Sequence, residues 1–176
     1  LVISKSLVEL MGGSFGLESS LGYGSTFFFT LDFEVSSREI TLLREVPNEF
    51  QGLRVLVVDD SDISLMILME LSDSLNFMAT PSDCGEDALT KIKLAEREGK
   101  PYKFVFMDWK MPVMDGLQAA EIINNDPEIR EKPAVILVTG NSKEEVGILA
   151  KQSGVNLDSV ITKPVTSSLL VDNVMN

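Results

Sequence analysis

The sequence contains no histidine among its 176 residues. A catalytic triad that relies on an imidazole is therefore excluded, and so is a zinc site with histidine ligands. A phosphorylated histidine within this chain is excluded for the same reason. Any chemistry that needs such a histidine would have to draw it from another segment or another protein.

Cysteine is almost as rare, since Cys84 is the only one. An internal disulfide is therefore impossible, and a reducing, cytoplasmic setting is expected. No apolar run approaches the roughly 18 residues that a membrane-spanning helix needs, and the N-terminus does not show the order of a signal peptide. The chain begins at Leu1 and not at Met, which indicates a piece of a longer protein. We expect no membrane contact by this piece, although upstream segments could anchor its parent.

Basic residues are outnumbered, with 15 Lys and Arg against 27 Asp and Glu and a net charge of −12. Such a surface repels phosphate backbones, so direct binding of nucleic acid is not expected. A hydrophobic content of 44% indicates a globular chain. Its length has room for one complete domain and part of another.

The N-terminal region shows two kinds of apolar pattern. Residues 1–11 have apolar side chains at helical spacing, and two glycines then end the helix. A period of two predicts a long strand at 26–35, and a short strand is expected at 15–18. These elements cannot bury their apolar faces alone, so residues 1–35 are expected to be the cut end of a larger α+β domain. Residues 36–52 show no sustained period and are expected to be a linker.

Residues 53–176 alternate between two patterns. Short apolar runs predict strands at 53–58, 77–80, 103–107, 134–138 and 159–162. Helical patterns follow these runs at 62–74, 85–98, 115–125, 143–153 and 166–176. This alternation predicts an α/β fold, a parallel sheet with helices on both faces.

Polar side chains stand where four of these strands end. They are carboxylates, a hydroxyl and an ammonium, namely Asp59, Asp60, Asp108, Thr139 and Lys163. In open parallel sheets the ligand site lies beyond the carboxyl ends of the strands, at the switch point of strand order. We therefore expect these five side chains to share one site.

Three carboxylates at one site repel one another, and a divalent cation with oxygen ligands relieves the repulsion. Mg²⁺ suits this open edge because it keeps several waters and takes one or two carboxylates plus phosphate oxygens. A carboxylate beside such a cation can attack a phosphoryl group, and Asp108 is the candidate nucleophile. Thr139 and Lys163 would bind the phosphoryl oxygens, and a cis bond from Lys163 to Pro164 would aim the lysine inward. Asp62 is expected to cap the following helix and not to bind metal.

These residues resemble the receiver domain of response regulators over about residues 53–176. The motifs that carry the resemblance are Val-Val-Asp59-Asp60, Met107-Asp108-Trp-Lys-Met-Pro-Val-Met-Asp-Gly116, Val138-Thr139-Gly140 and Thr162-Lys163-Pro164. The resemblance implies a flavodoxin-like (βα)5 domain with a five-stranded parallel sheet, which takes phosphate from a phosphohistidine onto Asp108. It also implies that Mg²⁺ is held by Asp59, Asp60, Asp108 and the Lys110 carbonyl. Thr139 and Lys163 would couple phosphorylation to a change at the surface.

Three other positions bear on how phosphorylation changes the surface and on how long the phosphoaspartate lasts. Receivers usually carry an aromatic residue three positions before the lysine, and this chain has Val160 there. The usual switch, in which the aromatic ring rotates inward, is therefore in doubt. Lys110 and Asn141 occupy positions that in the family influence how fast the phosphoaspartate hydrolyses.

The N-terminal region resembles the end of a histidine-kinase ATPase domain. The resemblance rests on residues 1–13, on Glu18-Ser19 and on residues 22–27. In that family the nucleotide-binding motifs lie upstream, so this chain would hold neither a complete ATP site nor the histidine. An ATPase remnant at 1–35, a linker at 36–52 and a receiver at 53–176 imply a hybrid sensor histidine kinase as the parent enzyme. Its receiver would bind a helical phosphohistidine domain, either the kinase dimerisation domain or a phosphotransfer domain.

Two other classes of function remain open. Asp60-Ser-Asp62 imitates the start of an aspartate-nucleophile phosphatase of the haloacid dehalogenase type, although only Asp172 supplies a carboxylate after Lys163. A pseudoreceiver would bind partners without phosphorylation, although the filled acidic, hydroxyl and lysine positions argue against this class. Apolar residues of the first helix of the domain would dock the phosphohistidine domain where they are not core, and the candidates are Ile63, Leu65, Met66, Leu68 and Met69.

Overall fold

The computed structural model describes residues 1–34, 50–153, 157 and 159–175. The chain divides into two compact units, Leu1–Ile40 and Thr41–Asn176. Most of the linker expected at 36–52 lies outside the described residues, so only its end at 50–52 can be placed. Each unit is described by itself below.

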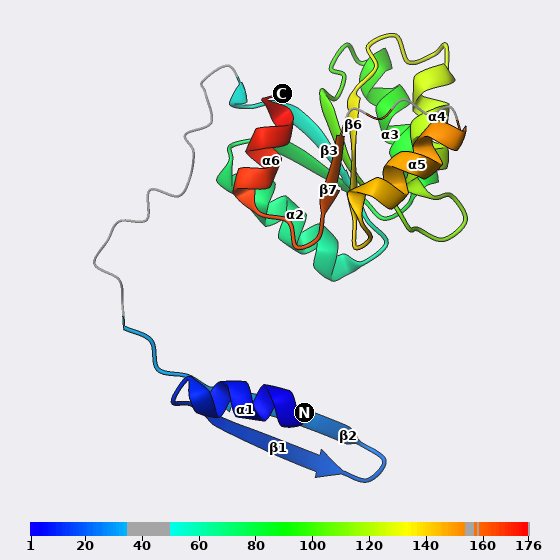
Figure 1. The fold of residues 1–176 in the computed structure, drawn as a ribbon. Coiled ribbons are helices and arrows are strands. Elements are labelled where there is room, and N and C mark those ends of the chain that lie inside the picture. The colour runs from blue at the N-terminus through cyan, green and yellow to red at the C-terminus, as the bar shows by residue number, and fades with distance from the viewer. Residues whose placement is uncertain (35–49, 154–156, 158, 176) are drawn as a thin grey trace. The chain divides into compact units, whose positions relative to one another are not determined.

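The N-terminal unit is a helix against a β-hairpin (Figure 1). Helix α1 (Val2–Leu10) contacts strand β1 (Ser14–Ser20), which pairs antiparallel with β2 (Gly24–Thr30). The helix ends before Gly12, whose φ of 79° is the left-handed conformation that glycine adopts without steric cost. A helix followed by two strands was predicted, but the strand expected to reach residue 35 ends at Thr30. It ends there because Thr30 pairs with Ser14, the first residue of β1, so the partner strand goes no further.

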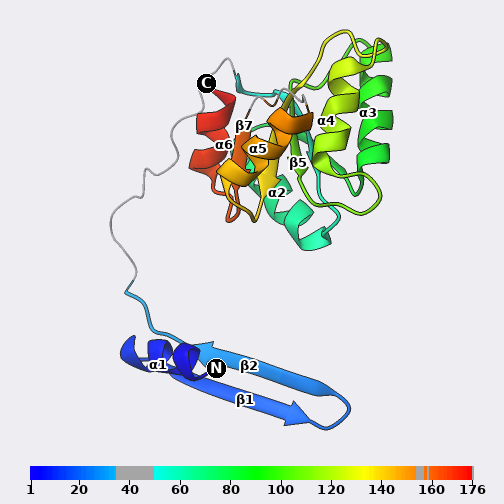
Figure 2. The ribbon, with the colours of Figure 1, turned by 45° about the vertical axis from the view of Figure 1, so that its right-hand side comes forward.

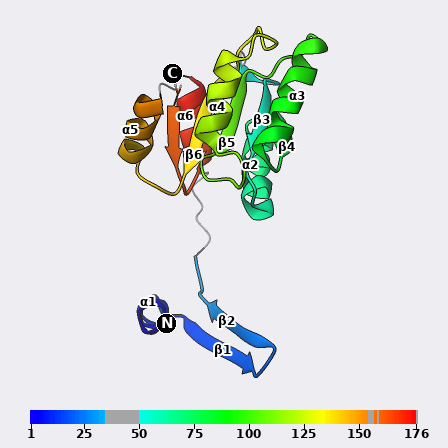
Figure 3. The same cartoon turned by 90° about the vertical axis from the view of Figure 1, so that its right-hand side faces the viewer.

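The second unit is a five-stranded parallel sheet between two layers of helices (Figures 2 and 3). Its strands are β3 (Arg54–Val58), β4 (Met78–Ser82), β5 (Phe104–Asp108), β6 (Ala134–Thr139) and β7 (Ser159–Thr162). Its helices are α2 (Asp62–Ser74), α3 (Gly85–Arg97), α4 (Gly116–Asn125), α5 (Lys143–Ser153) and α6 (Ser167–Val174). The strand order is β4-β3-β5-β6-β7. The α/β alternation expected from the sequence is therefore confirmed.

Two apolar clusters cover the two faces of the sheet. One joins the strands to α2 and α6, and the other joins them to α3, α4 and α5. Along β3 the residues alternate, because Val55 belongs to the first cluster and Leu56 to the second. The central strands are buried on both faces, as their unbroken apolar runs predicted, and full burial stabilises each such side chain by about 1.5–3 kcal/mol.

The first turn of α2 corrects one prediction. The N-cap is Ser61, whose hydroxyl accepts a hydrogen bond from the Ser64 N–H at 3.4 Å. Asp62, expected to be the cap, is instead the first residue inside the helix, where a carboxylate interacts favourably with the helix dipole. The cap therefore lies two residues after Asp59, one residue earlier than the prediction assumed. Ser61 thus stands between the strand tip and the helix.

Candidate functional site

The site lies at the carboxyl ends of β3 and β5, which are neighbours in the sheet. Val58 pairs with Met107, so the next residues, Asp59 and Asp108, stand side by side at the strand tips. The chain passes from β3 to β4 on one side of β3, whereas β5 lies on its other side. The two carboxylates therefore occupy the switch point of strand order, where ligand sites of such sheets lie.

A single ammonium joins these two carboxylates. The Lys163 Nζ lies 2.8 Å from Oδ2 of Asp59 and 2.6 Å from Oδ1 of Asp108. Asp59 is 1% exposed and Asp108 is 7% exposed, so both charges need a partner to remain ionised. The Lys163–Pro164 peptide bond is cis, one of the two forms that the sequence allowed.

The remaining carboxylate oxygens are held by backbone N–H groups. Oδ1 of Asp59 accepts from the Ser61 N–H at 2.9 Å, and Oδ2 of Asp108 accepts from the Lys110 N–H at 2.8 Å. In each case the donor lies two residues after the carboxylate, in the turn that leaves the strand. Both side chains are thus fixed by a local turn on one side and by Lys163 on the other.

Burial and pairing pull the pKa values of this site in opposite directions. Burial, helped by the nearby charge of Asp59, raises the pKa of Asp108 above its ordinary value, although the hydrogen bond and charge of Lys163 act to lower it. Burial lowers the pKa of Lys163, but its hydrogen bonds to Asp108 and Asp59 outweigh this, so that pKa is also raised. Lys163 is therefore kept as an ammonium beside Asp108.

Thr139 ends the strand next to β5 and is buried. Its hydroxyl oxygen accepts from the Asn141 N–H at 2.9 Å. Its backbone carbonyl accepts from the Lys163 N–H at 2.7 Å, which ties the end of β6 to the end of β7. A shift of either residue would therefore be felt by the other.

The predicted magnesium ligands are only partly brought together. Asp59 and Asp108 meet at Lys163, and Lys110 touches Asp108 through its N–H, whereas the Asp60 side chain is exposed. Across the described ranges no group of three acidic, histidine or cysteine side chains is arranged to hold a metal. The chemistry of the donors nevertheless fits Mg²⁺, because they are hard oxygens. Asp59 and Asp108 already share one cation, the Lys163 ammonium.

Three residues to which the sequence analysis gave no structural role contribute to the site. Ser61 both holds Asp59 and caps α2, and Trp109 is buried directly after Asp108. Gly116 begins α4 and donates its N–H to the Trp109 carbonyl at 2.8 Å. A serine before a helical pattern and an Asp-Gly pair at the start of another were the available signals.

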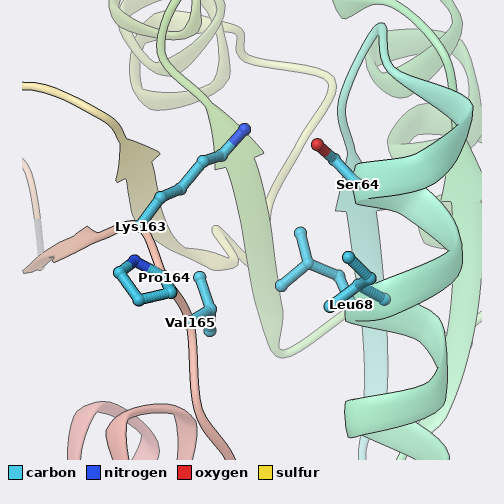
Figure 4. A pocket seen from close by; sticks show the side chains of 6 residues that line it. Ser64, Leu68, Lys163, Pro164 and Val165 are labelled. Carbon is cyan, nitrogen blue, oxygen red and sulfur yellow. The ribbon is translucent and has the colours of Figure 1, made fainter. Parts of the chain in front are cut away.

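An apolar groove adjoins the site between α2 and the segment after β7. Figure 4 shows Pro164 and Val165 facing Leu68 across it, with Lys163 at its upper end and Ser64 near the start of α2. Ile67 also lines the groove. Apolar contact surface is thus continuous with the phosphoryl-binding candidates.

Comparisons with known proteins agree with this geometry. Residues 55–175 match the sequence profile of the response regulator receiver domain. The chain is 32% identical over 120 residues to chemotaxis protein CheY-3 of Vibrio cholerae, covering 68% of this chain and 87% of that protein. It is 27% identical over 176 residues to ethylene receptor 2 of Oryza sativa, covering 96% of this chain but only 22% of the receptor.

A solved structure shows the same fold. It is the receiver domain of sensor histidine kinase PA1611 from Pseudomonas aeruginosa PAO1, with a magnesium ion coordinated in the active site cleft. The TM-score is 0.56 at 21% identity, covering 68% of this chain and 91% of that one. Within the described part of this chain, no helix is long and apolar enough to cross a membrane.

Proposed function

Because the chain belongs to the response regulator receiver family of two-component signalling, we propose that Asp108 accepts a phosphoryl group from a phosphohistidine outside this chain. The observation that carries the proposal is the Asp108 carboxylate at the strand tip, held by the Lys110 N–H and paired with the Lys163 ammonium. This arrangement places a nucleophile at the edge of the sheet and keeps a cation beside it.

The transfer follows from the groups at the site. An oxygen of Asp108 attacks the phosphorus, and the bond from phosphorus to the imidazole nitrogen breaks. The electron pair stays on that nitrogen, which takes a proton from solvent, and an aspartyl phosphate remains on the chain. Lys163 pairs with one phosphoryl oxygen as a point charge, and the Thr139 hydroxyl donates to another.

Asp59, Asp60, Asp108 and the Lys110 carbonyl would hold Mg²⁺ in this proposal. When bound, the ion supplies positive charge against the phosphoryl oxygens and the clustered carboxylates. Asp60 would reach it by a rotation of its exposed side chain. The magnesium ion in the active site cleft of the PA1611 receiver supports a magnesium site in this chain.

We infer that the phosphorylated state is signalled through the backbone that joins Thr139 to Lys163. Both side chains would turn toward the phosphoryl group, and the 2.7 Å hydrogen bond between their main chains links the two movements. Val160, which takes the place of the usual aromatic residue, is only partly buried and packs against the α3–α5 side of the core. A branched aliphatic side chain at that position would respond by repacking and not by rotation of a ring.

The proposed phosphodonor is a helical domain that docks on the apolar residues around the site. On α2, Ile63 is 68% exposed and Met66 is 63% exposed, whereas Leu68 is core. Val113, in the loop after Asp108, is 93% exposed. These side chains form an apolar rim beside the phosphoacceptor, suited to the apolar face of a helix.

We also propose that the parent protein is a hybrid sensor histidine kinase in the cytoplasm. The alignment with ethylene receptor 2 covers 96% of this chain, so it includes N-terminal residues that the receiver profile does not reach. The helix and hairpin at 1–34 would then be the last part of an ATPase domain. The complete kinase would supply both the ATP site and the histidine.

One experiment tests the phosphoacceptor. The full chain is incubated with acetyl phosphate and Mg²⁺, and its intact mass is compared with that of D108N treated in the same way. We expect a gain of one phosphoryl group that D108N does not show, together with a change in the fluorescence of Trp109. No gain in the unmodified chain would favour a pseudoreceiver, and a persistent gain in D108N would move the acceptor to another residue.

A further inference from the structure

The peptide group between Trp109 and Lys110 is held at both of its ends. Its carbonyl, on Trp109, accepts from the Gly116 N–H at 2.8 Å. Its N–H, on Lys110, donates to Oδ2 of Asp108 at 2.8 Å. Because a peptide group is planar and rigid, the direction set at the carbonyl end also sets the direction of the N–H. Gly116 therefore reaches the Asp108 carboxylate through one rigid unit.

The space around Gly116 admits no side chain. A Cβ at this position would lie 2.5 Å from the backbone oxygen of Asp108, 2.8 Å from Cδ2 of Leu137 and 3.1 Å from Cα of Trp109. Two of these atoms belong to backbone at the end of β5, where Asp108 pairs with Val138 of β6. That backbone cannot move aside without disturbing the sheet, whereas the Leu137 side chain can be shortened.

The start of α4 is fixed by other contacts as well. Asp115 and Gln118 form a capping box, in which each side chain accepts from the backbone N–H of the other residue. The Trp109 N–H donates to the Val138 carbonyl at 2.9 Å. The steric clash of a Cβ on residue 116 would therefore be relieved mainly by a shift of the Trp109–Lys110 peptide group, which lies between these fixed contacts.

We propose that Gly116 is a positioning residue for the phosphoacceptor, acting through the Trp109–Lys110 peptide group to fix the rotation of the Asp108 carboxylate. The proposal rests on the phosphoacceptor role of Asp108. Lys163 holds one carboxylate oxygen at 2.6 Å and the Lys110 N–H holds the other, so the plane of the carboxylate has one orientation. An attack on phosphorus depends on this orientation, because reacting atoms must be aligned before the bond forms.

The test compares Gly116→Ala with Gly147→Ala in the full chain. Gly147 lies in α5, and a Cβ there would meet no heavy atom within 4 Å, so it is the matched control. The NMR shift of the Lys110 amide proton reports its hydrogen bond to the carboxylate without any phosphate present. We expect Gly116→Ala to move this resonance upfield and to slow phosphorylation by acetyl phosphate and Mg²⁺ about 10- to 100-fold. Gly147→Ala should change neither.

A second variant separates positioning from packing. In Gly116→Ala/Leu137→Val the side-chain collision is removed, but the collision with the Asp108 backbone remains. We expect Gly116→Ala to lower the melting temperature. The double variant should regain part of that loss while its phosphorylation stays slow. Recovery of both together, or an unchanged Lys110 resonance and rate in Gly116→Ala, would overturn the proposal.

The unmodified chain offers a measurement that does not depend on how the variants fold. If one rigid peptide group links the two hydrogen bonds, the Gly116 and Lys110 amides should show the same protection from hydrogen exchange. Strong protection of one with rapid exchange of the other would overturn the proposal. Failure of the unmodified chain to take phosphate would instead refute the role of Asp108, and would leave the resonance and exchange results to decide on Gly116.

Discussion

The Lys163 ammonium, after β7, lies 2.6 Å from Oδ1 of Asp108, at the end of β5. The same ammonium is 2.8 Å from Asp59, so one cation balances two carboxylates that are almost completely buried. The strands β3 and β5 are neighbours, whereas β6 lies between β5 and β7. The long side chain of Lys163 therefore reaches both carboxylates from beyond β6. Loss of the ammonium should therefore lower the free energy of unfolding as well as impair phosphorylation.

Replacing Lys163 by Met removes this charge and keeps most of the side-chain length. Asp59 and Asp108 then face each other without a counter-charge, and we expect the free energy of unfolding to fall by about 1–3 kcal/mol. Urea denaturation measures the loss. The control is K103M, because Lys103 pairs with Glu131 at 2.9 Å on the exposed surface and should matter by at most about 0.5 kcal/mol. Equal losses in the two variants would contradict the pairing role of Lys163.

The carboxylate of Asp87, away from the site, gives a prediction for pH. Burial raises its pKa, but hydrogen bonds from Lys91 and Ser82 outweigh this, so the pKa lies below its ordinary value. A depressed folded pKa adds stability above the unfolded pKa and loses it as the pH falls through the folded pKa.

The unmodified chain should therefore exceed D87N in stability by about 0.5 kcal/mol at neutral pH, since the Asp87 side chain is 38% exposed. The difference should disappear as the pH falls below about 4. Urea denaturation of both chains from pH 7 to pH 3 checks this. A difference that stays constant over the whole range would show that Asp87 is not stabilised as an anion.

Val113 is expected to be strained, because it has a φ of 68° and branches at Cβ. Asparagine tolerates this conformation, so V113N should raise the free energy of unfolding by about 0.5–1 kcal/mol. V113T is the matched control, since threonine keeps the branch and should bring no gain. If Val113 contacts the phosphodonor, V113N should also slow transfer from a phosphohistidine domain while leaving the reaction with acetyl phosphate unchanged.

Met66 tests the proposed docking face of α2. We expect M66K to slow transfer from a phosphorylated helical domain about tenfold, because a charge replaces an apolar contact, whereas acetyl phosphate should react as before. L94K is the control, since Leu94 is similarly exposed but lies on α3, away from this face. Both transfer rates can be followed by intact mass. Equal slowing by M66K and L94K would place the docking face elsewhere.

The arrangement of the sheet could be predicted because its buried strands are visible in the sequence as short apolar runs. Apolar residues run through most of β3, β5 and β6, and a polar residue ends each run, either at the last position of the strand or directly after it. The same reasoning brought Asp59, Asp108 and Lys163 to one edge, and the structure places them in direct contact. The burial of a strand depends on the polarity of its own residues, so the sequence is enough to predict which strands are central.

Contacts that depend on local geometry could not be predicted in this way. Whether Ser61 or Asp62 caps α2 depends on one residue of register, and either side chain could have done it. The need for glycine at 116 comes from the backbone of Asp108 and Trp109, several residues earlier in the chain, and from the Leu137 side chain on β6. The length of β2 was set by its partner β1, which a pattern within β2 alone does not contain.

The most direct test of the phosphoacceptor is transfer from a phosphohistidine followed by identification of the acceptor residue. A phosphorylated helical phosphotransfer domain is mixed with the full chain and Mg²⁺, and the product is reduced with borohydride, which converts an aspartyl phosphate to homoserine. Tandem mass spectrometry should then find homoserine at position 108 and at no other aspartate. Loss of phosphate from the donor with an unmodified Asp108, or homoserine at Asp59 or Asp60 instead, would contradict the proposed function.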